Sequence, residues 1–195
     1  IVGAQQLTRG YAVGGTRRYM VVREVSLEVH PGEVVTVLGK PGSGKSTLMH
    51  LLGGLRRPVS GLVRIGGQDM TGLDNEQRVQ IRSEKIGFVF QAFKLLAGET
   101  ALANVELPLK HRGVNGWDRR EKAEAVLRSV GLGNRLDYTL GRLSERQRQC
   151  VAIAGAIVHE PAVMFVDEPT RAMDGTSQEE VMGLLQHLND QGQTI

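Results

Sequence analysis

The chain has 195 residues, a formal net charge of +3 and a single cysteine, Cys150. This length accommodates one domain with a sizeable hydrophobic core. The mild, scattered positive charge does not indicate nucleic-acid binding, a lone cysteine excludes an internal disulfide, and no apolar run approaches the roughly 20 residues that span a bilayer. We therefore expect one domain that meets a membrane only through a partner.

Residues 1–38 alternate short apolar runs with polar breaks, a pattern that predicts antiparallel strands. Within this segment, residues 25–29 show strict period-two alternation before a His-Pro-Gly turn, and residues 34–38 form an apolar, β-branched run that predicts a buried strand. Tyr11 is an aromatic residue whose ring could stack on a nucleotide base. Packing in the core or on the sheet surface accounts for Tyr11 equally well.

A glycine-rich loop of the pattern G-x-x-x-x-G-K-[S/T] follows the predicted strand, and a leucine-rich helix is predicted behind it over residues 47–55. Glycines let backbone N–H groups turn towards a phosphate, and a helix N-terminus adds partial positive charge. Lys45 is expected to reach the β- and γ-phosphates, Ser46 to hold Mg²⁺, and Thr47 to bond the α-phosphate side. The predicted nucleotide-binding residues are Gly39, Lys40, Pro41, Gly42, Ser43, Gly44, Lys45, Ser46 and Thr47.

The middle of the chain predicts a strand, a short polar helix and a second buried strand, over residues 61–67, 74–82 and 86–90. Gln91 stands at the carboxyl end of the second of these strands, the edge at which open α/β sheets bind ligands. A glutamine there is also compatible with an ordinary surface loop. Beyond it, the periodicity becomes helical up to residue 143, which predicts a small helical insert.

Two acidic residues, Asp167 and Glu168, follow a third predicted strand at residues 162–166 and so reach the same edge as Gln91. Beside a phosphate loop, Asp167 is expected to hold the metal through water and Glu168 to orient or deprotonate an attacking water. Without the loop, the pair would be interpreted as a surface feature. Capping boxes at Ser144 and Ser177 predict the starts of two further helices.

The fixed order of these motifs resembles the ATP-binding cassette of ABC transporters, over essentially all of the chain. The phrases at residues 86–91, 104–109 and 131–136 resemble the macrolide-export and lipoprotein-release branch. The resemblance implies an α/β fold in which a P-loop NTPase core, with a mixed or parallel sheet and flanking helices, carries an N-terminal antiparallel β part. It places the core at about residues 1–92 and 160–195, and an inserted helical subdomain at about residues 93–159.

The resemblance also implies an ATPase that uses ATP and Mg²⁺ and couples the closure of two head-to-tail cassettes to export or extraction by membrane subunits. The expected partners are a second ABC ATPase subunit, identical or different, and transmembrane permease subunits, with no nucleic acid. The expected location is the cytoplasm, on the inner face of the cell membrane through the permease.

Position by position, Tyr11 matches the adenine-stacking aromatic of such cassettes, and Ser144 matches the signature serine that faces the γ-phosphate of the other subunit. The implied catalytic residues are Lys45, Gln91 and Glu168. The implied metal ligands are Ser46, Gln91 and Asp167.

The signature departs from the family pattern Leu-Ser-Gly-Gly-Gln, because Glu145 and Arg146 replace its two glycines. The switch histidine of the family is expected beyond Ile195, after the next strand. These departures leave an alternative function open. In it, the chain is a nucleotide-binding, weakly hydrolysing cassette with a regulatory or structural role, of the cell-division type or as the degenerate half of a heterodimer.

Overall fold

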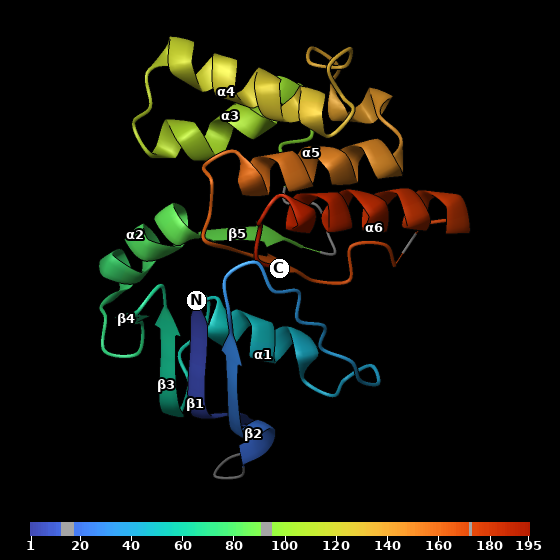
Figure 1. Ribbon diagram of the computed structural model, residues 1–195. Helices are drawn as coiled ribbons and strands as arrows, with labels where there is room; N and C mark the ends of the chain where they lie inside the picture. The colour runs from blue at the N-terminus through green and yellow to red at the C-terminus, as the bar shows by residue number, and fades with distance from the viewer. Residues whose placement is uncertain (13–17, 91–94, 172) are drawn as a thin grey trace.

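The N-terminal β part is a four-stranded antiparallel sheet (Figure 1). A computed structural model describes residues 1–12, 18–90, 95–171 and 173–195. In it, β1 (Val2–Ala12) lies between β2 (Arg18–Val29) and β3 (Ser60–Ile65), and the short β4 (Gln68–Asp69) pairs with β3. The predictions of antiparallel strands at residues 25–29 and 61–67 are confirmed.

Two parallel strands, β5 (Ile86–Val89) and β6 (Val163–Val166), form a second sheet in register from Ile86 opposite Val163 to Val89 opposite Val166. The backbone N–H of Asp167 donates to the Val89 carbonyl at 2.9 Å, so β6 ends beside the end of β5. The two buried strands predicted at residues 86–90 and 162–166 are therefore confirmed. Their shared carboxyl edge is where Asp167 emerges.

The strand predicted at residues 34–38 does not form. The segment has no regular secondary structure, and the side chains of Val34, Val35 and Leu38 are exposed, Leu38 by 86%. At its start, the Val35 N–H donates to the Ile195 carbonyl at 2.9 Å, and the Ile195 N–H donates to the carbonyl of the preceding residue, Glu33, at 3.0 Å. Pairing with one residue does not make a ladder, so the apolar, β-branched composition did not suffice for a strand.

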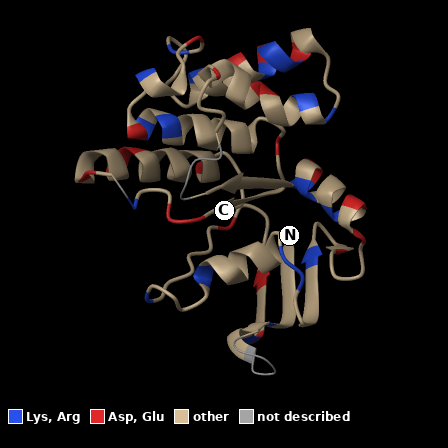
Figure 2. Ribbon diagram, turned by 180° about the vertical axis from the view of Figure 1, so that it is seen from behind, with Lys and Arg blue, Asp and Glu red and all other residues tan. Residues whose placement is uncertain are grey.

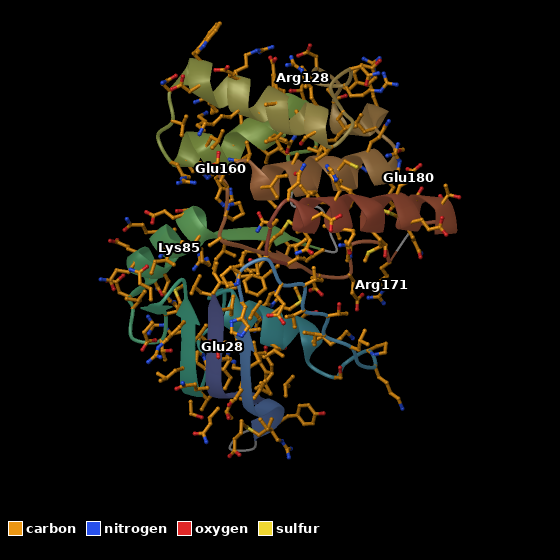
Figure 3. The ribbon with its side chains drawn as sticks, viewed as in Figure 1. Glu28, Lys85, Arg128, Glu160, Arg171 and Glu180 are labelled. Carbon is orange, nitrogen blue, oxygen red and sulfur yellow. The ribbon has the colours of Figure 1, made fainter. Side chains whose placement is uncertain are left out.

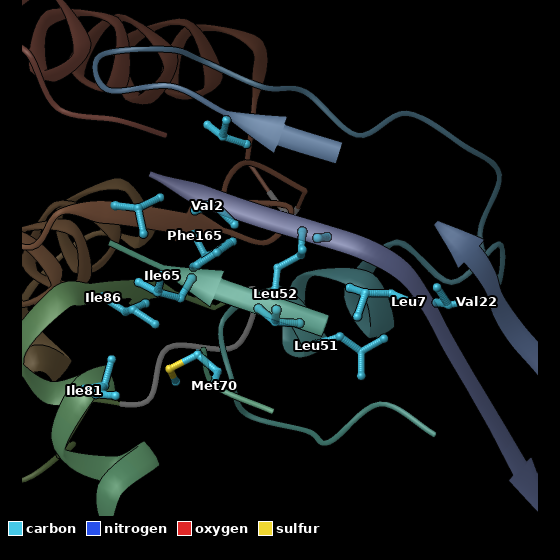
Figure 4. Close-up of a cluster of buried hydrophobic side chains, with 14 residues drawn as sticks. Val2, Leu7, Val22, Leu51, Leu52, Ile65, Met70, Ile81, Ile86 and Phe165 are labelled. Atoms are coloured by element: carbon cyan, nitrogen blue, oxygen red, sulfur yellow. The ribbon is translucent and has the colours of Figure 1, made fainter. Parts of the chain in front are cut away.

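The main core joins both sheets to the first two helices (Figure 4). Leu51 and Leu52 of α1 (Lys45–Leu52) pack in one cluster with Leu7 and Ile65 of the antiparallel sheet. The same cluster includes Ile81 of α2 (Asn75–Lys85) and Phe165 of β6. Burial of these side chains therefore holds the helix that follows the phosphate loop against both sheets.

The helices between residues 101 and 157 bury a core of their own, and they lie together in Figure 1. They are α3 (Ala101–His111), α4 (Gly116–Ser129), the one-turn 3₁₀ helix η1 (Leu140–Arg142) and α5 (Glu145–Ile157). Their core includes Val105, Leu127 and Val151, all fully buried. We propose from this separate core that about residues 93–159 form the helical subdomain and that the rest of the chain, about residues 1–92 and 160–195, forms the nucleotide-binding core.

The last helix, α6 (Gly175–Asp190), packs Val181, Leu185 and Leu188 in a third cluster with residues of β5, β6 and α5. It begins two residues before the predicted capping serine, Ser177. Asp174 is the N-cap instead, because its carboxylate accepts the Ser177 N–H at 2.9 Å and the Ser177 hydroxyl at 3.1 Å. The Ser177 N–H lowers the pKa of the Asp174 carboxyl.

Positions of Lys or Arg and positions of Asp or Glu occur together on several of the helices (Figure 2). On α4, Glu124 pairs with Arg120 at 2.8 Å and with Arg128 at 3.0 Å, both four residues away. Pairs of this spacing support an exposed helix face. Among the described helices, none has the length and hydrophobicity of a membrane span.

Gly87 provides a stability prediction, because it sits where β5 meets α5. A Cβ at this position would lie 2.3 Å from the Ala156 carbonyl oxygen, so we expect Gly87→Ala to push α5 off the sheet and destabilise the fold by about 1–3 kcal/mol. The matched control is Gly183→Ala on the exposed face of α6, where a Cβ meets nothing within 4 Å. That change should stabilise the fold by up to about 1 kcal/mol. Urea denaturation measures both, and equal effects would contradict the packing described here.

Candidate nucleotide site

The glycine-rich loop runs directly into α1, and its last glycine is conformationally required. Gly44 is the N-cap of α1 with φ of 98°, in the left-handed region, and a Cβ there would lie 2.7 Å from Val21 Cγ1. No side chain caps the helix, and its first turn contains no acidic residue. The free N–H groups of this turn and the helix dipole therefore present positive charge that suits an anion.

Lys45 lies folded back into the loop. Its Nζ donates to the carbonyl oxygens of Gly39 at 2.9 Å and Lys40 at 3.3 Å. It also lies 3.9 Å from Glu168 Oε1. The ammonium group is thus held over the loop opening by neutral carbonyl oxygens and one carboxylate, an arrangement that leaves it able to turn to a phosphate.

Ser46 and Asp167 bring two oxygen donors together beside the loop. The Ser46 hydroxyl donates to Asp167 Oδ1 at 3.2 Å, across 121 positions of sequence. Among the described residues, no group of three or more His, Cys, Asp and Glu side chains is placed to cage a metal. One hydroxyl and one carboxylate fit Mg²⁺, which is usually bound by one or two carboxylates together with phosphate and water oxygens.

Glu168 has a left-handed backbone, with φ of 45°, which costs free energy for a residue with a side chain. While Oε1 faces Lys45, Oε2 accepts a hydrogen bond from Arg171 Nη1 at 2.9 Å. The sequence analysis did not identify Arg171. The sequence feature that could have predicted this ion pair is the position of Arg171, three residues after Glu168 in a turn.

Tyr11 is adjacent to the first turn of α1. Its hydroxyl lies 3.4 Å from the Thr47 hydroxyl and accepts a hydrogen bond from Arg56 at 3.0 Å. The guanidinium carbons of Arg9 and Arg56 lie 5.3 and 5.5 Å from the ring centre. The hydrogen bond with Thr47 lowers the pKa of the Tyr11 hydroxyl, with the charges of Arg56 and Arg9 adding to the effect. Sequence reasoning missed both arginines, which reach the ring only through the fold.

The predicted signature residue Ser144 lies apart from this group, at the exposed N-terminus of α5. Its hydroxyl accepts the Gln147 N–H, and the Gln147 side chain accepts the Ser144 N–H, so the predicted capping box is confirmed. Arg146 points to α6, where its Nε lies 2.7 Å from Glu180 Oε2. Glu180 and Arg171 are both labelled in Figure 3. Gln91 lies outside the described residues.

The site described so far is a phosphate loop with an adjoining acidic strand end, on a core that carries an N-terminal antiparallel sheet. The family model described as "ABC transporter" matches residues 22–171. The chain therefore belongs to the ABC transporter family and is an ATPase of that family.

Relatives place the chain in the macrolide-export branch. It is 42% identical over 189 residues to the macrolide export ATP-binding/permease protein MacB of Salmonella typhimurium, covering 97% of this chain and 29% of the relative. It is 43% identical over 181 residues to an uncharacterised ABC transporter ATP-binding protein of Thermotoga maritima, covering 93% of this chain and 77% of the relative. The chain thus spans less than a third of the length of the MacB relatives.

A solved structure shares the whole fold. It is the ATP-binding cassette MJ0796, in a dimeric post-hydrolysis state bound to ADP and Pi, with 37% sequence identity and a TM-score of 0.89. The match covers 100% of this chain and 85% of the solved one. The expected α/β fold, a P-loop NTPase core with an N-terminal antiparallel part and inserted helices, is confirmed.

The position of Lys45 generates a binding prediction. We expect Lys45→Ala to weaken ATP binding by at least about tenfold, because removing a charge-assisted contact to phosphate costs roughly 1.5–3 kcal/mol. Calorimetric titration with ATP measures the affinity, and thermal unfolding checks that the fold is intact. Lys110→Ala, on an exposed position of α3, is the matched control and should bind ATP as the unchanged chain does. Equal affinity in all three proteins would remove Lys45 from the site.

Proposed function

We propose that this chain is the ATP-binding and hydrolysing cassette of an ABC transporter, which couples closure of two cassettes to export or extraction by membrane permease subunits. The observation that carries the proposal is the meeting of Lys45 and Ser46, at the start of α1, with Glu168 and Asp167, at the end of β6. This arrangement combines phosphate-binding cations, metal-binding oxygens and a carboxylate base. The MacB relatives, named as macrolide export ATP-binding/permease proteins, support a permease partner. We place the chain at the cytoplasmic face of the membrane through that partner.

Each residue of the loop has a role in holding the nucleotide. Lys45 would leave the loop carbonyls and turn to the β- and γ-phosphates, and the backbone N–H groups of the loop, which Pro41 lacks, would surround them. The Tyr11 ring would stack on adenine, and Thr47 would bond the α-phosphate side. Both lie at the same end of α1, which agrees with a nucleotide that runs from Tyr11 to the loop.

Mg²⁺, when bound, would neutralise charge on the phosphates, and Ser46, Asp167 and Gln91 would hold it. Glu168 would accept a proton from the attacking water as general base. The Glu168 carboxylate is 33% exposed and faces the loop through Oε1. A base must stay within hydrogen-bond reach of its water, and a carboxylate that faces the loop from the strand end supports this role.

The partner cassette would approach the exposed N-terminus of α5, with Ser144 facing its γ-phosphate. Two features at this point oppose tight closure. Glu145 would bring negative charge towards the phosphate, and among the described residues it forms no ion pair that offsets its charge. Arg146, the nearest cation in sequence, is engaged by Glu180.

These two features favour the second candidate function, a weakly hydrolysing cassette with a regulatory or structural role. Glu145 and Arg146 occupy positions where glycines would let the backbone approach phosphate closely. A heterodimer relieves the conflict, because the signature of a different partner would serve the phosphate loop of this chain. The intact Lys45, Asp167 and Glu168 favour hydrolysis in such a pair.

Replacement of the base tests the catalytic role. In the full protein that carries this chain, Glu168→Gln should keep ATP affinity and lower turnover by at least about 10²-fold, because an amide cannot accept the proton. Steady-state phosphate release measures turnover, and calorimetry measures binding. Unchanged turnover in this variant would assign the base to another residue.

The signature itself supplies the test between the two functions. We expect Glu145→Gly combined with Arg146→Gly to strengthen ATP-driven dimer formation and raise turnover, because charge and bulk are both removed from the interface. Glu180→Gln alone is the informative control, since it frees Arg146 and leaves Glu145 in place. Analytical ultracentrifugation with ATP and phosphate release report the two effects. If the double replacement changes neither, the weakly hydrolysing alternative should be dropped.

A further inference from the structure

The turn after β6 contains an ion pair that the roles assigned above do not use. Arg171 Nη1 donates to Glu168 Oε2 at 2.9 Å, and the Arg171 backbone N–H reaches the Glu168 carbonyl at 3.4 Å. The pair is therefore formed within one tight turn. Because the turn is short, the guanidinium meets the carboxylate at the point where Glu168 leaves the strand.

The backbone of Glu168 is already constrained on both sides of this pair. Asp167, its neighbour, is anchored to β5 through the Val89 carbonyl, and Glu168 itself has the left-handed φ of 45°. The remaining freedom lies in the side-chain torsions of Glu168. A hydrogen bond to one of its two carboxylate oxygens restricts those torsions.

The two carboxylate oxygens face different cations. Oε1 is 3.9 Å from Lys45 Nζ, a distance that leaves it loosely held, whereas Oε2 is bonded to Arg171. When Lys45 turns to the phosphates, Oε1 loses its cation and becomes free to accept a proton. Oε2 keeps its bond, because Arg171 lies outside the phosphate loop.

We propose that Arg171 is a positioning residue for Glu168, which fixes Oε2 so that Oε1 points at the attacking water. This inference rests on the proposed role of Glu168 as general base. In this arrangement Arg171 acts only through the carboxylate of Glu168. A base that is already oriented raises the rate, because the entropy of reaching the reactive geometry no longer adds to the activation free energy.

The size of the effect follows from exposure. The side chain of Arg171 is 60% exposed and that of Glu168 is 33% exposed, so solvent screens the pair. Solvent-exposed ion pairs contribute little interaction free energy. We therefore expect the loss of this pair to change the rate by roughly two- to fivefold.

The test compares Arg171→Ala, Arg171→Lys and Arg120→Ala in the full protein. Arg120 is a matched exposed arginine, 2.8 Å from Glu124 on α4 and outside the site. We expect Arg171→Ala to lower kcat about two- to fivefold with the KM for ATP unchanged, Arg171→Lys to restore part of the loss, and Arg120→Ala to change neither parameter. Thermal unfolding of each variant checks that the fold is intact. An unchanged or raised kcat in Arg171→Ala, or a lysine variant as slow as the alanine variant, would overturn the inference.

A double variant shows whether Arg171 acts through Glu168. On a Glu168→Gln background, Arg171→Ala should produce no further loss of the residual turnover. A further loss of the same size as in the single variant would overturn the inference while leaving the role of Glu168 in place. If Glu168→Gln alone retains full turnover, the assignment of the base fails and the role of Arg171 fails with it.

Discussion

The structure depends most on the contact between the first turn of α1 and the end of β6. Ser46 and Asp167, 121 residues apart, are joined there by one hydrogen bond, and Lys45 faces Glu168 beside them. The proposed site needs both halves, because Mg²⁺ is usually bound by one or two carboxylates together with phosphate and water oxygens. The hydrophobic cluster that includes Leu51, Leu52 and Phe165 keeps the two halves together.

Among the described residues, the ion pairs beside this contact between α1 and β6 join Glu168 to Lys45 and to Arg171. Lys45 is satisfied by loop carbonyls, and Glu168 is shared between Lys45 and Arg171. Under the proposed function, the negative charge of a bound nucleotide would draw Lys45 away from the loop carbonyls and from Glu168. At the predicted signature the charge balance is poorer, since Arg146 is held by Glu180, and Glu145 forms no ion pair among the described residues.

Sequence reasoning succeeded where the cause of a feature is local. Neighbouring residues alone predict three features: the capping box of Ser144 with Gln147, the period-two strand at residues 25–29, and the end of a strand just before Asp167. It failed at residues 34–38, because a strand also needs a neighbouring strand, which composition does not reveal. It also misplaced the start of α6, since Asp174 and Ser177 are both able to cap and only the folded chain selects between them.

Contacts between residues distant in sequence were beyond prediction from one chain. Arg56 reaches Tyr11 across 45 positions, and Arg146 reaches Glu180 between two helices. Both involve long, flexible cations whose partner depends on how the elements pack. Arg171 is different, because its partner is three residues away and a turn between them is predictable. A search for charged residues within turns at the acidic strand end would have found it.

The most direct test of the central claim is a crystal structure of the full protein with Mg²⁺ and a non-hydrolysable ATP analogue. We expect Lys45 Nζ to leave the carbonyls of Gly39 and Lys40 for the phosphates, and the Ser46 hydroxyl to coordinate the metal at about 2.1 Å. The Arg171–Glu168 pair should persist, with Oε1 facing the terminal phosphate. A nucleotide bound elsewhere, or Lys45 still bonded to the loop carbonyls with the nucleotide in place, would contradict the account.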